Sequence, residues 1–350
     1  SAASFMAATI AMHTITRLGE FLEHSGARYR LFDLGSQLRR LSSDDWQRFD
    51  RGGAYPYPHL NHAWLVVLLW HPDNREQHAL WFFKLPLDEQ ATLPAPVAAD
   101  LLNRFIKALA TGDAEERQRL LTDHPYQFKP DDARMAALHA RAGRILGAPV
   151  SQFFAAAHDY LLGSADLTTW SHLGVQGIAE VLEAADEAEQ SRLGQRLATL
   201  PITPRLQILQ ALEHHRPSLA LTQAIIALAD ADSSPEQDSA AVRALSQSEA
   251  IGLVRAFISR ALNRQPQLLD LVLAILSRHP RLLDDTELSL VALDRLAQLA
   301  DQDGFNRVVQ GLALQPGLSG LVLKVMRHPN RSEALVQAIG GLLAAVRSVQ

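Results

Sequence analysis

The chain contains no cysteine. Disulfides, thiolate metal sites and cysteine nucleophiles are therefore excluded, and a reducing compartment fits the chain easily, so we expect a cytoplasmic protein. Long hydrophobic runs are missing too. No apolar stretch approaches the roughly 18 to 20 residues that cross a bilayer, and we expect no membrane partner.

Motifs of the common catalytic sites are also missing. The sequence has no glycine-rich phosphate loop, no GxSxG nucleophile elbow and no calcium-binding EF-hand spacing. These absences lower the odds of an enzyme, and no cofactor is expected. Lysine is scarce, with four in 350 residues, so arginine carries most of the positive charge.

The composition is that of a folded protein, with 47% hydrophobic and 20% charged residues. A formal net charge of −5 gives no overall field that favours nucleic acid or an anionic membrane. The length suits two domains, or one domain and a repeat array. The mildly apolar run over residues 2–14 lacks the basic start of a secretion signal, and we interpret it as a leader before a natural start at Met6 or Met12.

Two segments near the C-terminus are close copies of one another. Residues 265–280 and 315–329 both begin with Gln-Pro, continue with an apolar stripe and end in Arg-His-Pro, and a weaker copy covers 203–217. Self-similarity of this kind is typical of stacked helical repeats. We expect the clearest repeats at 192–231, 250–299 and 302–348.

Each copy is expected to hold about three helices, one before the first proline, one between the prolines and one after the second. Leu271, Val272 and Ile275 follow helical spacing, and Leu321, Val322 and Val325 repeat the pattern. We place the first proline in the first helical turn and the second at the helix end. Histidines recur near these helix ends, at His215, His279 and His328. We interpret them as donors to free helix carbonyls. An Asp- and Ser-rich insertion at 230–238 would lengthen the first copy.

The N-terminal part has a different pattern. Strands are predicted at 28–34, 63–70 and 79–83, with helices at 15–23, from 42 or 43 to the glycines at 52, and at 97–110. From residue 131 onward every segment is typical of helix. The fold class is therefore mainly α: a small α+β domain with about three strands over 1–125, followed by an α-helical repeat array of HEAT-like or α-solenoid type over 126–350.

Several distinctive strings occur in the N-terminal part, namely Tyr29 to Gly35, the Tyr-Pro-Tyr-Pro run ending at Pro58, Trp64 to Trp70 and Trp81 to Gln90. In these strings and in its layout the chain resembles an uncharacterised bacterial family of nearly this whole length, known only as a domain of unknown function. The resemblance implies no catalytic or ligand residues.

His59 and His62 are the closest histidine pair outside the repeats. Imidazole is a good transition-metal ligand, but a spacing of three residues entering a strand sends the rings to opposite faces, and no further ligand is present at a suitable spacing. We therefore interpret them as capping or surface residues and expect no metal. Tyr55 and Tyr57 belong to an aromatic cluster that is typical of core or of a ligand pocket.

The loop after residue 83 is the predicted polar rim of that cluster, because Lys84, Asp88 and Glu89 can orient a ligand. These observations lead to three hypotheses. The first is a non-enzymatic scaffold or adaptor that binds protein or peptide on a helical-repeat surface. The second is a hydrolase or metal-dependent enzyme with a site at the domain junction, built from His59, His62, Lys84 and Asp88. The third is a helical array that binds nucleic acid through arginine. The sequence does not indicate an oligomeric state.

Overall fold

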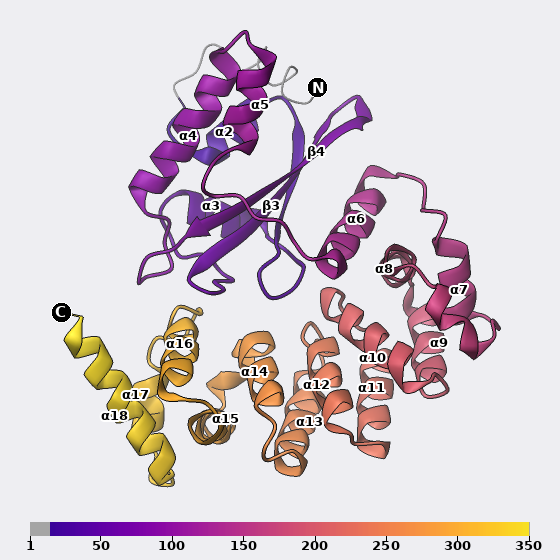
Figure 1. The fold of residues 1–350 in the computed structure, drawn as a ribbon, viewed down its shortest axis with the longest axis vertical. Helices are drawn as coiled ribbons and strands as arrows, with labels where there is room; N and C mark the ends of the chain where they lie inside the picture. The colour runs from indigo at the N-terminus through magenta and orange to yellow at the C-terminus, as the bar shows by residue number, and fades with distance from the viewer. Residues whose placement is uncertain (1–14, 350) are drawn as a thin grey trace. The chain divides into compact units, whose positions relative to one another are not determined.

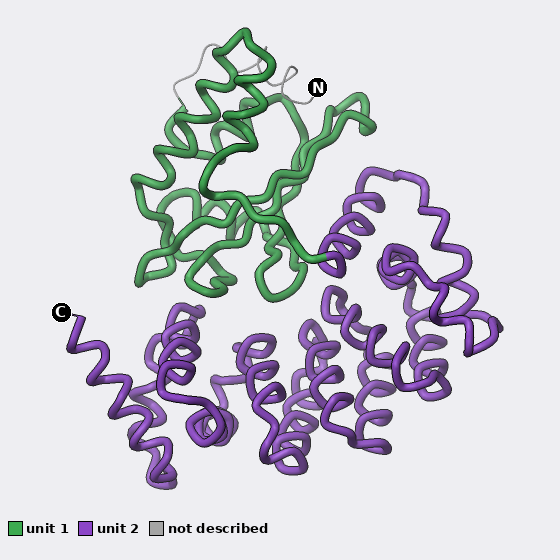
Figure 2. The backbone as a smooth tube through the Cα atoms, viewed as in Figure 1, with its two compact units in different colours: residues 1–131 green, residues 132–350 purple. Residues whose placement is uncertain are grey.

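The computed structural model describes residues 15–349, which divide into two compact units on either side of the boundary between Asp131 and Asp132 (Figure 2). The expected leader over 2–14 lies outside the described residues. The boundary follows residue 131, whereas the sequence analysis placed it after residue 125. Two contacts tie the intervening segment to the first unit: the Lys84 amide donates to the Tyr126 carbonyl at 2.6 Å, and the rings of Trp64 and Phe128 lie 5.1 Å apart.

The first unit is an α+β fold built on an antiparallel sheet (Figure 1). Its elements are, in chain order, α2 (Leu18–His24), β1 (Arg28–Asp33), β2 (Arg39–Arg40), α3 (Ser43–Asp50), β3 (His62–His71), β4 (Asn74–Pro86), α4 (Ala95–Ala110) and α5 (Ala114–Thr122). The strand order is β2-β1-β3-β4. The expected strands and helices are confirmed, and β2 is an additional, two-residue edge strand that is too short to leave a periodic signal.

The core of the first unit lies on one face of the sheet. Leu65, Val67 and Leu69 alternate along β3 and pack with rings from the surrounding helices, Phe49 of α3 and Phe105 of α4. Alternation places these side chains on one face because successive strand residues point to opposite sides. The strand is buried over most of its length, which explains why its sequence is continuously apolar.

The second unit contains helices only. Its elements are α6 (Asp132–Leu146), α7 (Phe154–Leu162), η1 (Leu167–His172), α8 (Val175–Ala184), α9 (Glu187–Leu197), α10 (Ile202–Ala211), η2 (Leu212–His214), α11 (Leu219–Ala231), α12 (Pro235–Ala244), α13 (Ile251–Arg264), α14 (Leu269–Arg278), η3 (Pro280–Asp284), α15 (Thr286–Leu299), α16 (Gln302–Ala313), α17 (Leu321–Met326) and α18 (Glu333–Ser348). The described residues of the chain are therefore mainly helical, as expected.

Helices of the second unit pack in chain order (Figure 1). The even-numbered helices from α6 to α14 contact one another in sequence, and so do the odd-numbered helices from α7 to α13. Contacts between neighbouring numbers, such as α7 with α8 and α13 with α14, join the two rows. A continuous hydrophobic core follows from this arrangement and extends from Ala157 to Leu342.

The predicted copies each contain a helix before, between and after the prolines. These helices are α9 to α11 in the first copy (192–231), α13 to α15 in the second copy (250–299) and α16 to α18 in the third copy (302–348). The predicted insertion at 230–238 covers the end of α11 and the start of α12, which is an additional helix between the first and second copies; its residues from Gln237 to Val242 are buried. The predicted position of the first proline is confirmed in the first copy, where Pro204 lies in the first turn of α10. It was wrong in the other two, because α14 starts three residues after Pro266 and α17 starts five residues after Pro316.

Candidate binding surfaces

His59 and His62 close a tight turn in which Leu60 and Asn61 adopt φ angles of 50° and 60°. Their backbones exchange two hydrogen bonds of 3.0 Å, so the pair forms a bridge across the turn. Positive φ at both central residues is the signature of a type I′ hairpin turn. The prediction that the rings point to opposite faces was therefore wrong: both rings lie beside Trp64, with centroid distances of 6.2 and 6.1 Å.

Lys84 reaches the same indole from the neighbouring strand. Its ammonium lies 4.6 Å from the centroid of Trp64, which its β4 position opposite Trp64 makes possible. A cation over an indole face is attracted by the ring quadrupole. The structure thus brings His59, His62 and Lys84 together around one half-buried tryptophan, although the sequence analysis had treated the histidines and the lysine loop separately.

The two tyrosines differ in accessibility. Tyr55 is fully buried, and its hydroxyl donates to Asp33 Oδ1 at 2.7 Å, so burial and the nearby carboxylate raise the pKa of the phenol. Tyr57 is half-buried and lies under the guanidinium of Arg39, 4.7 Å from its ring centroid. Tyr55 is therefore a core residue, while Tyr57 retains an accessible edge.

Asp88 is occupied by its own turn. Its carboxylate accepts from the amides of Gln90 and Thr92 at 3.0 and 2.9 Å and from the Thr92 hydroxyl at 2.6 Å. The bonds from Thr92 lower the pKa of Asp88. Glu89 is exposed beside it. Over residues 15–349 no group of three or more metal-ligating side chains lies close enough to hold an ion.

The recurring histidines contact neighbouring helices rather than the ends of their own. His279 is fully buried and its Nε2 lies 2.7 Å from the carbonyl of Val242, in the last turn of α12. His328 Nε2 lies 2.8 Å from Glu287 Oε1 of α15, and His215 Nδ1 lies 3.3 Å from Glu183 Oε2 of α8. The predicted interaction with free carbonyls holds for His279 alone, and there the carbonyl belongs to another helix.

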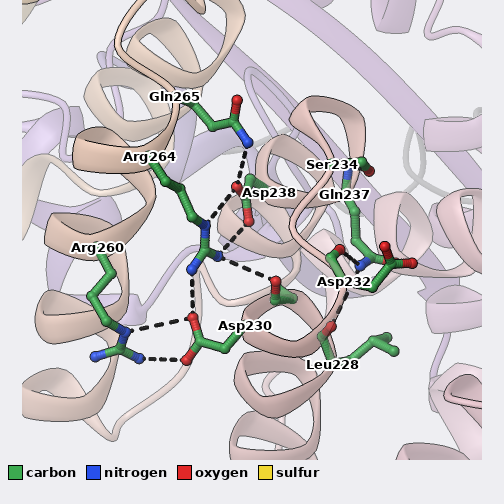
Figure 3. A network of polar contacts seen from close by, with 10 residues as sticks. Leu228, Asp230, Asp232, Ser234, Gln237, Asp238, Arg260, Arg264 and Gln265 are labelled. Carbon is green, nitrogen blue, oxygen red and sulfur yellow. Dashed lines mark hydrogen bonds and ion pairs between the residues drawn. The ribbon is translucent and has the colours of Figure 1, made fainter.

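A buried ion pair joins the second copy to the helix before it (Figure 3). Arg264 of α13 donates to both oxygens of Asp238 of α12 at 2.9 and 2.5 Å, and Asp238 is fully buried. Arg264 also bonds Asp230 of α11 at 2.6 Å, and Arg260 joins Asp230 at 2.8 Å. Burial raises the pKa of Asp230, but the bonds from the two arginines outweigh it and the net shift is downward. The network contains two arginines and two aspartates, so its charges balance, and it connects α11, α12 and α13.

A second charged cluster surrounds η2. Arg141 of α6 donates to Glu183 Oε1 at 2.6 Å and to the His214 carbonyl at 3.1 Å, and Arg278 of α14 bonds Glu213 at 3.0 Å. His214 is 3% exposed, and burial together with the positive charges of its neighbours lowers its pKa to about 3. The ring is therefore neutral at physiological pH and structural in character.

A groove of about 440 Å³ lies between α13 and the start of α15. One wall consists of small residues one or two helical turns apart on the outer face of α13, namely Gly252, Ala256, Ser259 and Asn263. Nothing lies within 4 Å of the position a Cβ would take on Gly252. Leu262, Leu288 and Val291 supply an apolar surface. Volume and lining are in the range of a binding site.

The rim of this groove carries more negative than positive charge. Asp284, Asp285 and Glu287 surround a single guanidinium, Arg255, whose Nη2 lies 3.5 Å from Asp284 Oδ1 and whose Nε lies 3.6 Å from Asp285 Oδ2. The side chains of Asp284 and Glu287 are each 75% exposed. His328 Nε2 lies 2.8 Å from Glu287 Oε1, and the Lys324 ammonium donates to the Asp284 carbonyl at 2.8 Å, so the rim holds three carboxylates against the cations of Arg255 and Lys324. The excess is one negative charge, and the exposed side chains of Asp284 and Glu287 can face a cationic ligand.

Sequence reasoning missed the groove. The available signal was the small-residue spacing at 252, 256, 259 and 263, which lies on the face of α13 opposite its buried stripe. The sequence analysis used that helix only for its apolar periodicity. Which helix packs beside it, and hence which second wall it receives, depends on tertiary structure.

A family model described as "Protein of unknown function (DUF3549)" matches residues 13–343. The chain belongs to this family. The resemblance drawn from the N-terminal strings is thereby confirmed as a domain of unknown function that spans nearly the whole chain. No curated protein and no solved structure matches the chain.

Within the part of the chain that the structure describes, no helix is both long enough and apolar enough to span a bilayer.

Proposed function

We propose that the protein is a non-enzymatic interaction scaffold that binds a protein segment in the groove between α13 and α15. The observation that carries this proposal is the groove itself: a 440 Å³ depression with a small-residue wall, an apolar side and an acidic rim. Scaffolds of stacked helices recognise partners through such surfaces. We further propose a bacterial, cytoplasmic setting, which suits a cysteine-free chain.

The proposal includes a HEAT-like helical-repeat array for the second unit. Its support is the recurrence of a three-helix pattern in the three copies and the contacts between successive helices in each row. Repeats of this kind present many similar faces and differ in the side chains at each one. The groove between α13 and α15 is then one face of the repeat array, and its own side chains determine what it binds.

The partner that fits best is an amphipathic helix with basic residues at its edge. Small residues along α13 allow a second backbone to approach closely, and Leu288 and Val291 can receive the apolar side chains of that helix. Lysine or arginine of the partner would meet Asp284 and Glu287, which are largely exposed. Complementary charge of this kind favours encounter and fixes orientation.

The other hypotheses have less support. An enzyme built on His59, His62, Lys84 and Asp88 would need Asp88 as an acid or base, yet its oxygens are already engaged by its own turn. Nucleic-acid binding would need arginines that are accessible to phosphate. Several arginines of the second unit are instead paired with carboxylates, among them Arg264 with Asp238 and Arg278 with Glu213.

Affinity capture from a bacterial extract tests the proposal when three versions of the full chain are compared. Ala256→Trp fills the groove, whereas Leu253→Trp places the same side chain on the same helix at an exposed position outside the groove lining. We expect a partner that wild type and Leu253→Trp retain and Ala256→Trp loses. Glu287→Arg should weaken capture as well, and raised salt should do the same because the charged rim is exposed.

The result that contradicts the proposal is equal recovery of the same partner by Ala256→Trp and Leu253→Trp, or recovery of no partner by any version. Circular dichroism of each variant checks that the helices remain folded. A retained partner whose contact segment is acidic rather than basic would contradict the charge argument while leaving the groove as its site.

A further inference from the structure

Helix α18 presents a face that no other described helix of the second unit covers. Its buried side, with Leu335, Ile339 and Leu342, packs against the preceding helices of the third copy and α15. On the opposite side Val336 is 47% exposed and Leu343 is 38% exposed. Valine and leucine exposed side by side on one helix face indicate a contact surface.

The exposed residues follow a heptad pattern. Glu333, Gly340 and Arg347 are seven residues apart, and Val336, Leu343 and Ala344 lie between them. At about 100° per residue, all six fall within about 60° of the direction of Gly340 around the helix axis. A seven-residue spacing keeps one narrow stripe in register with a second helix. The stripe is apolar and small at its centre and charged at its two ends.

We propose that this stripe binds a second copy of the same chain, with the two α18 helices antiparallel and Gly340 at the two-fold axis. Residues at equal distances before and after Gly340 then face each other, as a symmetric interface requires. Glu333 of one copy faces Arg347 of the other, twice in the dimer, and Val336 faces Ala344. The charge pattern therefore complements itself only in the antiparallel orientation.

Local contacts leave these groups available for a partner. Nothing lies within 4 Å of the position that a Cβ would take on Gly340, so two backbones can approach closely at the axis. Among the described residues Arg347 has no ion-pair partner, and the Glu333 carboxylate accepts a 3.3 Å bond from Gln337 on its own helix. A parallel pair would instead place Glu333 opposite Glu333 and Arg347 opposite Arg347, which like charges disfavour.

The size of the helix sets the expected affinity. α18 has 16 residues, which corresponds to a length of about 24 Å. One helix pair of this length lies at the small end of specific interfaces, so we expect a reversible dimer with a dissociation constant in the micromolar range. The proposal is independent of the groove, which lies on other helices, and does not require the binding function.

Sedimentation equilibrium of the full chain over a concentration series tests the dimer with three charge variants. Arg347→Glu places Glu opposite Glu, and Glu333→Arg places Arg opposite Arg; each should weaken dimerisation at least about tenfold. The double variant Glu333→Arg/Arg347→Glu restores opposite charges in both pairs, and we expect its dissociation constant to return to within about threefold of wild type.

Gly340→Glu supplies an independent test, because it puts two like charges beside each other at the axis while its side chain meets nothing in the single chain. We expect a monomer with an unchanged or raised unfolding temperature, since glutamate is the better helix former. Circular dichroism checks that all variants keep their helices, including Glu333→Arg, which removes an acid from the first turn. A wild-type chain that remains monomeric to about 0.5 mM, or a double variant that stays as weak as the single ones, would overturn the proposal.

Discussion

The second and third copies share Leu-Val-Leu and Arg-His between their prolines, yet the same side chains have different surroundings in the two copies. His279 in the second copy is fully buried and bonds a backbone carbonyl of α12, whereas His328 in the third copy bonds Glu287, a side chain that is 75% exposed. Likewise Val272 is 1% exposed, while the equivalent Val322 is half-buried. Position within the array therefore decides how deeply a repeated residue is buried.

Differences in sequence accompany this difference in depth. The second copy has Asp270, and the third has Gly320 fifty residues later. With glycines at 317 and 320, the third copy has a low helix propensity at this point, and α17 is six residues long against ten for α14. Arg264, the centre of the buried ion network, corresponds to Leu314 in the third copy, so that network exists in the second copy alone.

The largest expected effect comes from breaking the ion network of the second copy. Asp238→Ala should lower the free energy of unfolding by about 3–5 kcal/mol, because Arg264 loses two charge-assisted hydrogen bonds to a fully buried carboxylate and keeps only the partly exposed Asp230 as a partner. Asp270→Ala, which removes a pair between Arg243 and a 57% exposed carboxylate, should cost less than about 1 kcal/mol. Urea denaturation followed by circular dichroism measures both.

A double replacement separates the contribution of the Arg264–Asp238 pair from the cost of leaving Arg264 without Asp238. In Asp238→Leu/Arg264→Leu no charge is left unpaired, and the variant should recover much of the stability lost in Asp238→Ala. Equal losses in Asp238→Ala and Asp270→Ala would show that the second copy is not anchored by this network.

The recurring histidines give the next largest difference. His279→Ala should cost about 2–3 kcal/mol, because it removes a fully buried ring and leaves the carbonyl of Val242 without that bond. His328→Ala should cost at most about 1 kcal/mol, since its partner Glu287 is largely exposed. Thermal or urea unfolding of the two variants side by side checks the ratio. If the two costs were equal, the argument from depth in the array would fail.

Acid stability extends the comparison to the first copy through His214. Its pKa is about 3 in the folded chain against 6.5 for an ordinary histidine. Above pH 6.5 the ring is neutral in both states; below it the unfolded chain binds a proton that the folded chain does not, so stability is lost as the pH falls toward 3. Between pH 7 and 5 the loss should be about 2 kcal/mol.

His214→Gln is the matched control for that loss, because glutamine stays neutral over the whole range. The pH dependence of urea midpoints should be shallower in His214→Gln than in wild type between pH 7 and 5, before most carboxylates titrate. Identical slopes in the two proteins would assign the acid sensitivity to other groups.

Sequence patterns predicted the elements better than the contacts between them. Period-two and period-3.6 spacing indicates which face of a strand or helix is apolar, and so β3, β4 and the three helices of each copy were predicted, although β4 is longer than expected and α14 and α17 begin later. The type I′ turn at His59 was missed because Leu60 is an unusual residue for positive φ. The edge strand β2 was missed because two residues show no period.

The binding groove illustrates what the sequence leaves open. The spacing of Gly252, Ala256 and Ser259 indicates the wall that α13 supplies. The other wall comes from α15, and no local sequence pattern specifies that this helix packs beside α13. The same holds for Asp238, which looked like part of a polar insertion and is fully buried because Arg264 reaches it from the next helix. Pairing between distant residues, rather than local propensity, decides both.

The smallest expected effect is a difference in stability between substitutions at two adjacent glycines of α18, Gly340 on its exposed face and Gly341 beside Gln302 of α16. Gly340→Ala should raise the free energy of unfolding by about 0.5–1 kcal/mol, because its added methyl group meets nothing and alanine favours helix. At Gly341 the methyl group would lie 2.4 Å from Gln302 Oε1, so Gln302 must move and its 2.9 Å bond to the Ala338 carbonyl is lost. That loss offsets the gain in propensity, so Gly341→Ala should be less stable than Gly340→Ala by about 1 kcal/mol. Urea unfolding well below micromolar concentration measures the difference in the single chain, and equal stabilities would mean that α16 does not hold α18 through this contact.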